Sequence, residues 1–217
     1  MKKTSMMTSM KRKTETQSIR NKISKRRKVS AFSLFIFKIY TYIRLMKALY
    51  IHGFQSSPVP VKVKALEEIF GQVIAPHIDW EDDKRRQNLF KELDEVIKSE
   101  GITHVIGSSM GGQMAFYLAT KNNIDALCFN PAFGVRYDDF GYDLNKNFNS
   151  NILIVLGKND DVVDPEKSHE FLRSNGIYNK VELAIEDMGH QISLPVFIKY
   201  AMFTKKWTEV EQKNKNL

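Results

Sequence analysis

From residue 46 onward, short continuous apolar runs alternate with longer segments of helical periodicity. The apolar runs are four to six residues long. Runs of this kind are typical of strands that are buried on both faces of a parallel sheet. The alternation therefore predicts an α/β fold with a mainly parallel sheet of about six strands and helices on both faces. The expected strands are 48–52, 72–75, 103–107, 126–130, 152–157 and 181–185.

The segments between these runs have the periodicity and end signals of helices. In residues 83–99 the apolar side chains recur at i, i+3 and i+4 spacing, which places them on one stripe of a helix. Asp164 followed by Pro165 is typical of an N-cap with proline in the first turn, and Gly176 follows the end of the same segment. The expected helices are 61–70, 83–99, 112–121, 165–174 and 194–208.

The charge of the chain is unevenly distributed along it. The 217 residues carry a formal net charge of +8, but residues 1–30 alone hold 11 Lys/Arg against one acid. From residue 46 to the end, 20 basic and 24 acidic side chains leave a net charge of −4. The body of the protein therefore lacks the basic face of a nucleic-acid-binding protein, and we expect no nucleic-acid partner. Cys128 is the only cysteine, which excludes a disulfide framework and a cysteine-based zinc site.

Residues 1–45 differ in composition from the rest of the chain. Residues 1–30 have almost nothing to bury and are expected to be disordered. Residues 31–46 are apolar and aromatic, but Lys38 and Arg44 keep the uncharged run below the roughly 20 residues that span a bilayer. The long charged lead and the lack of an A-x-A-like site also argue against a secretory signal.

Three interpretations of residues 1–45 remain open. They are an organelle presequence, an interfacial helix on anionic lipid, or an upstream extension of a functional protein that starts at Met46. The sequence thus predicts two parts: residues 1–45 as a basic extension, disordered or non-native, and residues 46–217 as one folded domain. The expected location is cytoplasmic, or an organelle if the extension is a presequence. Membrane contact is expected only if the extension belongs to the functional protein.

Residues 107–111 match the pattern G-x-S-x-G, with Ser109 as the central serine. By composition we expect ~0.04 such matches in a chain like this one. A predicted strand precedes the motif and a predicted helix follows it, which is the setting of a nucleophile elbow. In such an elbow a Cβ at Gly107 or Gly111 would collide with neighbouring backbone. The alternative is a glycine-rich turn from strand to helix without catalysis.

An earlier strand end carries the second element of this pattern. Residues 49–51 lead into His52-Gly53-Phe54. In folds with a nucleophile elbow, one N–H group of the oxyanion hole belongs to the residue after the nucleophile, and the other belongs to the loop after an earlier strand. We therefore assign the oxyanion hole to the backbone N–H groups of Met110 and Phe54, and we expect the His52 side chain to brace the loop.

An acid and a histidine follow later strands in the order that completes a triad. Asp160 follows the expected strand 152–157, and His190 follows the strand 181–185. The order Ser, Asp, His is the order of triad residues in this architecture. The sequence predicts Ser109 as nucleophile, His190 as general base and Asp160 as the acid. The other histidines lie in settings that favour structural roles.

The longest connection, residues 131–151, contains five aromatic side chains. Loops of this length without secondary structure are uncommon in compact domains and are often functional. The two interpretations are a lid over the site and a loop that packs over the edge of the sheet.

The motifs together resemble the YqiA-type esterases, a compact branch of the α/β-hydrolase superfamily. The resemblance covers residues 46 to about 207 and rests on the segments LYIHGFQSSP, IGSSMGGQMAFYLA, FNPA, LGKNDDVVDP and MGH. It implies a compact α/β-hydrolase fold and a triad of Ser109, Asp160 and His190. It also implies a small acyl ester or thioester as substrate, an acyl-enzyme intermediate, and neither a cofactor nor a metal. Residues 1–45 have no counterpart in this family.

Two other functions fit parts of the sequence. The first is a non-catalytic binding protein with an α/β-hydrolase fold, although such proteins usually lack a triad member. The second is a lipid-facing hydrolase that its basic N-terminus tethers to a membrane. Vesicle binding of the full chain and of a chain starting at Met46 distinguishes the second function from an untethered esterase.

Deletion of residues 1–45 should leave the melting temperature and ester hydrolysis close to those of the full chain. The reason is that every strand and helix signal of the expected fold lies after residue 45. Thermal melts and hydrolysis assays of both chains test this expectation. A large fall in melting temperature on truncation would show that residues 31–45 stabilise the domain.

Overall fold

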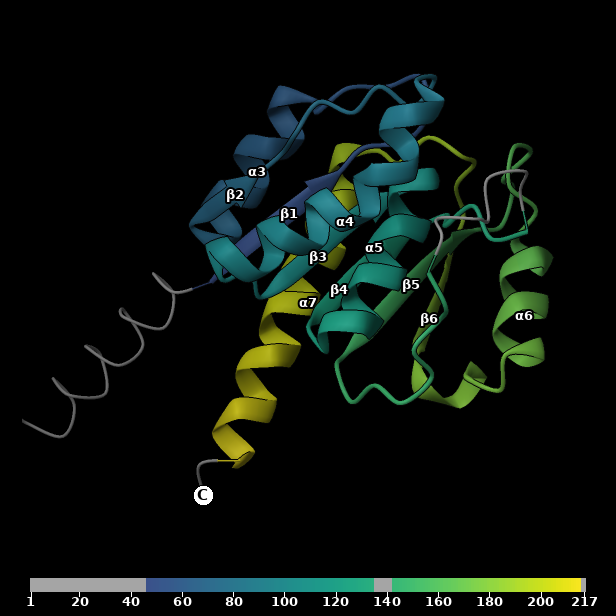
Figure 1. The fold of residues 1–217 in the computed structure, drawn as a ribbon. Helices are drawn as coiled ribbons and strands as arrows, with labels where there is room; N and C mark the ends of the chain where they lie inside the picture. The colour runs from purple at the N-terminus through teal and green to yellow at the C-terminus, as the bar shows by residue number, and fades with distance from the viewer. Residues whose placement is uncertain (1–45, 135–141, 216–217) are drawn as a thin grey trace, which may run out of the picture. The chain divides into compact units, whose positions relative to one another are not determined.

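The computed structural model describes residues 46–134 and 142–215, and within them six parallel strands form one sheet (Figure 1). The strands are β1 (Lys47–Ile51), β2 (Gln72–Ile74), β3 (His104–Ser108), β4 (Asp125–Phe129), β5 (Ile152–Gly157) and β6 (Glu182–Glu186). Each lies within one residue of its expected bounds. The predictions for residues 1–45 fall outside the described residues.

The strand order is β2-β1-β3-β4-β5-β6, and every neighbouring pair is parallel. The chain therefore first moves from β1 to the edge strand β2 and then crosses back to place β3 on the other side of β1. In open parallel sheets, ligands bind at such a reversal, outside the carboxyl ends of the two central strands. The sequence patterns that predicted the strands did not predict the order of the strands in the sheet.

Helices cover both faces of the sheet, as expected. The helices are α3 (Pro60–Phe70), α4 (Asp83–Glu100), α5 (Met110–Asn122), α6 (Pro165–Ser174) and α7 (Leu194–Lys215). Helices α3 and α7 pack together on one face, and α4 and α5 pack together on the other (Figure 1). The Asp164 carboxylate accepts the Glu166 N–H at 2.9 Å and caps α6, as the sequence predicted.

Helix α5 is the most buried helix of those described. All of its residues from Met110 to Thr120 are buried. It packs along β3 and β4 and reaches β1. A helix that is apolar around most of its circumference can only be stable inside a core. The turn before α5 is thereby fixed against the centre of the sheet.

Two helices extend beyond their expected bounds by more than one residue. Helix α5 begins at Met110 rather than at residue 112, because the two glycines after Met110 hide the start of the helix from a propensity argument. Helix α7 continues to Lys215 rather than ending at residue 208, because its last turns lack the apolar periodicity that predicts a helix. The short 3₁₀ helix Tyr178–Lys180 was not predicted.

The described part of the long connection packs against the helices. The Phe133 ring stacks on Phe171 of α6 at 4.1 Å between centroids, and Tyr142 stacks on Phe90 of α4 at 4.0 Å. Phe148 is buried. These contacts place the described part of the connection on the helices rather than over the edge of the sheet. Residues 135–141 of the expected lid lie outside the described residues.

Cys128 is the fourth residue of β4 and is fully buried. In the register of the sheet it pairs with Gly107 of β3. Burial raises the pKa of its thiol far above the ordinary value. Within the described residues, no helix is long and apolar enough to cross a bilayer.

The amino ends of β3 and β4 meet α7 in a buried polar network. The His104 ring nitrogens lie 2.8 Å from the Thr103 hydroxyl and 3.1 Å from the Thr208 hydroxyl of α7. Thr208 also hydrogen-bonds the carboxylate of Asp125. Burial lowers the pKa of His104 to about 4, although the carboxylate of Asp125 opposes this effect. His104 is therefore neutral in the folded protein at neutral pH.

The lowered pKa of His104 predicts a loss of stability in mild acid. Between its ordinary pKa of 6.5 and about 4, the unfolded chain binds a proton at His104 that the folded chain does not. The free energy of unfolding therefore falls as the pH decreases through this range. We expect His104→Gln to make this fall shallower in urea titrations at several pH values between 7 and 4. An unchanged pH dependence would show that His104 is not responsible.

Candidate active site

Ser109 lies in a strained turn between β3 and α5. Its backbone has φ 54° and ψ −123°, a region that residues other than glycine rarely occupy. A Cβ built on Gly107 would lie 2.1 Å from the carbonyl oxygen of Gly111. A Cβ built on Gly111 would lie 2.2 Å from the carbonyl oxygen of Ile51 in β1. Both glycines are therefore required by the close approach of backbone segments, as the sequence motif predicted.

Backbone hydrogen bonds hold this turn on both sides of Ser109. Its N–H donates to the carbonyl of Phe129 at 2.9 Å. Its own carbonyl accepts the N–H of Gln113 at 3.0 Å and the N–H of Ala132 at 3.1 Å. The preceding serine, Ser108, instead hydrogen-bonds through its side chain to Tyr50. The two serines of the motif thus have different surroundings.

The loop after β1 lies against Ser109. A Cβ built on Gly53 would lie 3.1 Å from the Cβ of Ser109 and 3.8 Å from its Oγ. Since β1 and β3 are the two strands at the reversal of strand order, this contact lies where an open parallel sheet binds ligands. Phe54 follows Gly53 and packs against the core. Met110 is the first residue of α5, whose leading N–H groups have no acceptor within the helix.

The buried side chain of His52 holds this loop in place. It is fully buried, and its Nε2 lies 2.9 Å from the N–H of Ile78. Nε2 must therefore accept this hydrogen bond, so the ring proton is on Nδ1 and donates to the carbonyl of Gly53 at 2.9 Å. Burial lowers the pKa of His52, which also favours the neutral ring. The structural role that the sequence suggested for His52 agrees with these contacts.

Asp160 and His190 are hydrogen-bonded to each other. The Nδ1 of His190 lies 2.8 Å and 3.0 Å from the two carboxylate oxygens of Asp160. The same carboxylate accepts the N–H groups of Val162 and Val163, each at 2.9 Å. The Asp160 side chain is only 1% exposed. Because a carboxylate can only accept a hydrogen bond, Nδ1 of His190 must carry a proton. Nε2 is then left as the basic nitrogen.

The neighbouring acids have other surroundings. The side chain of Asp161 is exposed, and the carboxylate of Asp164 caps α6. Of the three acids on this loop, the structure therefore brings Asp160 to His190.

The loops that carry Asp160 and His190 pack closely on each other. A Cβ built on Gly157, at the end of β5, would lie 2.7 Å from the carbonyl oxygens of both Met188 and Gly189. Asn159 also donates its backbone N–H to the carbonyl of Met188 at 3.0 Å. The pair of side chains is thus supported by direct backbone contact between the two strand ends.

Sequence reasoning missed Asn130, the residue directly after β4. Its side chain is hydrogen-bonded to Gly157, Gly189 and His190 at once. The available signal was an amide side chain at the carboxyl end of a predicted parallel strand, an edge where functional residues gather.

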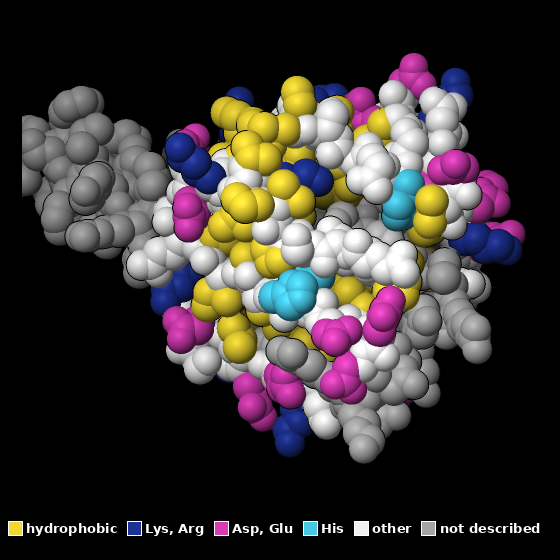
Figure 2. All heavy atoms as spheres, turned by 90° about the horizontal axis from the view of Figure 1, so that it is seen from above, with side chains coloured by type: hydrophobic (Ala, Val, Ile, Leu, Met, Phe, Trp, Pro, Cys, Tyr) yellow, Lys and Arg dark blue, Asp and Glu magenta, His cyan; other side chains and the backbone are white. Residues whose placement is uncertain are grey.

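Figure 2 looks onto the face at the carboxyl ends of the strands. Histidine side chains reach the surface there, with a hydrophobic area on one side and carboxylates on the other. Within the described residues, no group of three or more His, Cys, Asp or Glu side chains is arranged to hold a metal ion.

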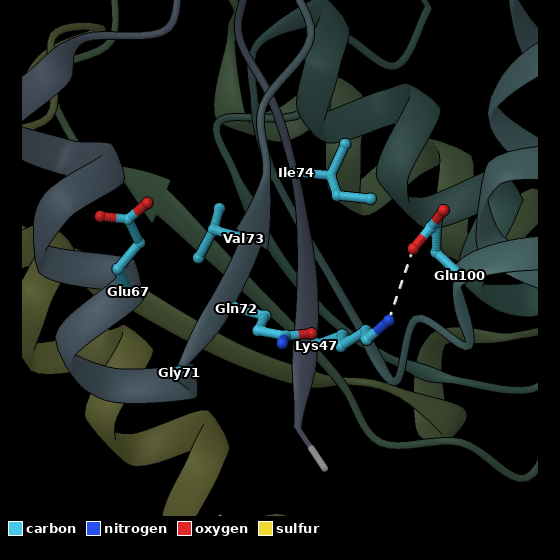
Figure 3. A pocket seen from close by; sticks show the side chains of 7 residues that line it. All are labelled: Lys47, Glu67, Gly71, Gln72, Val73, Ile74 and Glu100. Carbon is cyan, nitrogen blue, oxygen red and sulfur yellow. Dashed lines mark hydrogen bonds and ion pairs between the residues drawn. The ribbon is translucent and has the colours of Figure 1, made fainter. Parts of the chain in front are cut away.

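A separate hollow of about 350 Å³ lies at the opposite end of the sheet (Figure 3). The residues that line it are Lys47, Glu67, Gly71, Gln72, Val73, Ile74 and Glu100. Lys47 and Glu100 form an ion pair there at 3.4 Å. Because Lys47 and Gln72 begin β1 and β2, this hollow is at the amino ends of the strands, whereas Ser109 follows the carboxyl end of β3.

Comparisons with known proteins agree with this fold. Residues 47–149 match an uncharacterised protein family, UPF0227. A comparison with functionally curated proteins gives no significant match.

Solved structures of α/β hydrolases are similar to the chain at low sequence identity. A Xanthomonas campestris protein of the alpha/beta hydrolase superfamily has 18% identity and a TM-score of 0.57, over 78% of this chain and 98% of its own. A Bacillus cereus carboxylesterase has 20% identity and a TM-score of 0.54, over 74% of this chain and 88% of its own. A monoacylglycerol lipase from Paleococcus ferrophilus has 12% identity and a TM-score of 0.57, over 74% of this chain and 93% of its own. These similarities establish the fold.

Proposed function

We propose that the chain, whose residues 47–149 match the uncharacterised family UPF0227, is a serine hydrolase of acyl esters or thioesters with an α/β-hydrolase fold. The observation that carries this proposal is the hydrogen bond between Asp160 and His190, at the same edge of the sheet as the strained turn at Ser109. The proposal includes the domain bounds 46–217 and the cytoplasmic location expected from the sequence. The carboxylesterase and lipase of similar fold are consistent with this class of substrate.

The first half of the proposed reaction forms an acyl-enzyme. The Oγ of Ser109 attacks the acyl carbonyl, and Nε2 of His190 takes the hydroxyl proton. Asp160 holds the imidazole with its proton on Nδ1 and stabilises the imidazolium that forms. His190 then donates the proton to the leaving alkoxide or thiolate, and the acyl group stays on Ser109.

The second half hydrolyses this intermediate. His190 takes a proton from a water molecule, which attacks the acyl carbonyl, and then returns the proton to Ser109. In both halves the developing oxyanion is placed against the N–H groups of Phe54 and Met110. Loss of one donor in such a hole costs about 2.7–4 kcal/mol of transition-state stabilisation in a related enzyme. The contact of Gly53 with Ser109 supports this placement, because a side chain there would occupy the approach to Oγ.

Ser109→Ala should abolish ester hydrolysis and covalent labelling by a fluorophosphonate while the fold is retained. Loss of the nucleophile alone costs about 10⁶ in kcat in a comparable triad. Ser108→Ala is the matched control, since its side chain bonds to Tyr50 instead. Activity that survives in Ser109→Ala, or is lost only in Ser108→Ala, would contradict the assignment. Failure of the folded wild type to react with any ester or thioester would favour a binding protein.

Asp160→Asn should lose far more activity than Asp161→Asn. In a related triad the same change cost about 10⁴ in kcat, because the histidine took the wrong tautomer. We expect Asp161→Asn to lose less than about tenfold, since its side chain is exposed. The measurement is kcat of both variants on one ester, with circular dichroism to confirm the fold. Equal losses would indicate an acid shared between the two positions, and the reverse order would refute the role of Asp160.

A further inference from the structure

Asn130 has a backbone conformation and a degree of burial that set it apart from an ordinary loop residue. It follows β4 directly, has φ 41° and is 2% exposed. Asparagine is one of the few residues that adopt positive φ without large strain. Buried side-chain amides must find hydrogen-bond partners, because an unpaired one costs free energy. The partners of Asn130 therefore show what the position does.

The side chain of Asn130 joins the end of β5 to the backbone of His190. Its Oδ1 accepts the N–H of Gly157 at 2.7 Å. Its Nδ2 donates to the carbonyl of Gly189 at 3.2 Å and to the carbonyl of His190 at 3.1 Å. One N–H donor and two carbonyl acceptors allow only this orientation of the amide. A single side chain thus fixes the spacing between the strand end before Asp160 and the backbone that carries the imidazole.

The backbone around Asn130 holds the third part of the site. The carbonyl of Phe129 accepts the N–H of Ser109, and the N–H of Ala132 donates to the carbonyl of Ser109. The N–H of Asn130 itself donates to Val155 of β5 at 2.9 Å. The segment 129–132 is therefore bonded to the turn of the nucleophile on one side and to the strand of the acid on the other.

We propose that Asn130 is a positioning residue that sets the place of the His190 imidazole relative to Ser109. The inference rests on the proposed function and adds to it a residue that touches neither substrate nor reacting atoms. The bond from His190 to Asp160 restrains the rotation of the ring, whereas the bonds from Asn130 restrain the backbone from which the ring projects. Displacement of a reacting group by about 1 Å can cost roughly 100-fold in rate.

The test uses Asn130→Gly, which removes the amide and tolerates the positive φ. Its matched control is Asn123→Gly, because Asn123 also has positive φ, at 54°, but lies at the C-terminus of α5, toward the opposite end of the sheet. We expect Asn130→Gly to lower kcat by about 10- to 100-fold with KM changed less than about twofold. Asn123→Gly should leave both unchanged.

A second measurement separates this inference from the proposed function. The NMR signal of the His190 Nδ1 proton reports the ring position without any substrate. We expect the signal to shift or broaden in Asn130→Gly and to stay unchanged in Asn123→Gly. If the wild type hydrolyses esters but Asn130→Gly keeps its kcat and its His190 signal, the positioning role is refuted. If the wild type is as inactive as Ser109→Ala but the His190 signal still changes in Asn130→Gly, the proposed function is refuted. The positioning of His190 by Asn130 is then retained.

Asn130→Asp provides an independent variant should the glycine variant prove unstable. It keeps the acceptor for the N–H of Gly157 but turns a second oxygen toward the carbonyls of Gly189 and His190. The repulsion between these oxygens should displace the His190 backbone and reduce kcat at least as strongly as the glycine variant does. Wild-type kcat in a folded Asn130→Asp would overturn the inference.

Discussion

The site depends on a contact between backbone segments that leaves no room for a side chain. The start of α5 lies so close to β1 and β3 that a Cβ at Gly107 or Gly111 would fall about 2 Å from a carbonyl oxygen. This closeness forces the turn between strand and helix to be sharp, and Ser109 takes its unusual φ as a result. A strained conformation persists only where the surroundings over-determine it. Here the buried helix α5 and the backbone hydrogen bonds of Ser109 with Phe129 and Ala132 do so.

Much of the fold could be predicted because its four central strands, β1, β3, β4 and β5, are buried on both faces. Ile152–Gly157, for example, is an unbroken apolar run between polar segments, and its expected and observed bounds coincide. The end of α7 could not be predicted, since the sequence of its last turns has no apolar periodicity. The order of the strands could not be predicted either. Apolar runs show that a strand is buried, but not which neighbours it pairs with.

The same limit applies to the site. Ser109, Asp160 and His190 could be selected because each follows a predicted strand in the chain order of a known architecture. Asp160 was chosen from the sequence as well, but the hydrogen bonds from the N–H groups of Val162 and Val163 that orient its carboxylate toward His190 were not part of that prediction. Asn130 escaped prediction for a related reason. Its partners are backbone groups 27 to 60 residues away, and backbone groups leave no trace in the sequence.

The burial of Cys128 has a practical consequence for the study of this protein. It is the only cysteine of the chain, it lies in the middle of the sheet, and burial raises the pKa of its thiol. Because the thiolate is the reactive form, alkylating reagents will leave it untouched in the folded state. The folded natural protein therefore has no cysteine that reacts with thiol reagents. Val162→Cys, at an exposed position beside Asp161, would carry a single fluorophore or spin label next to the site without any other substitution.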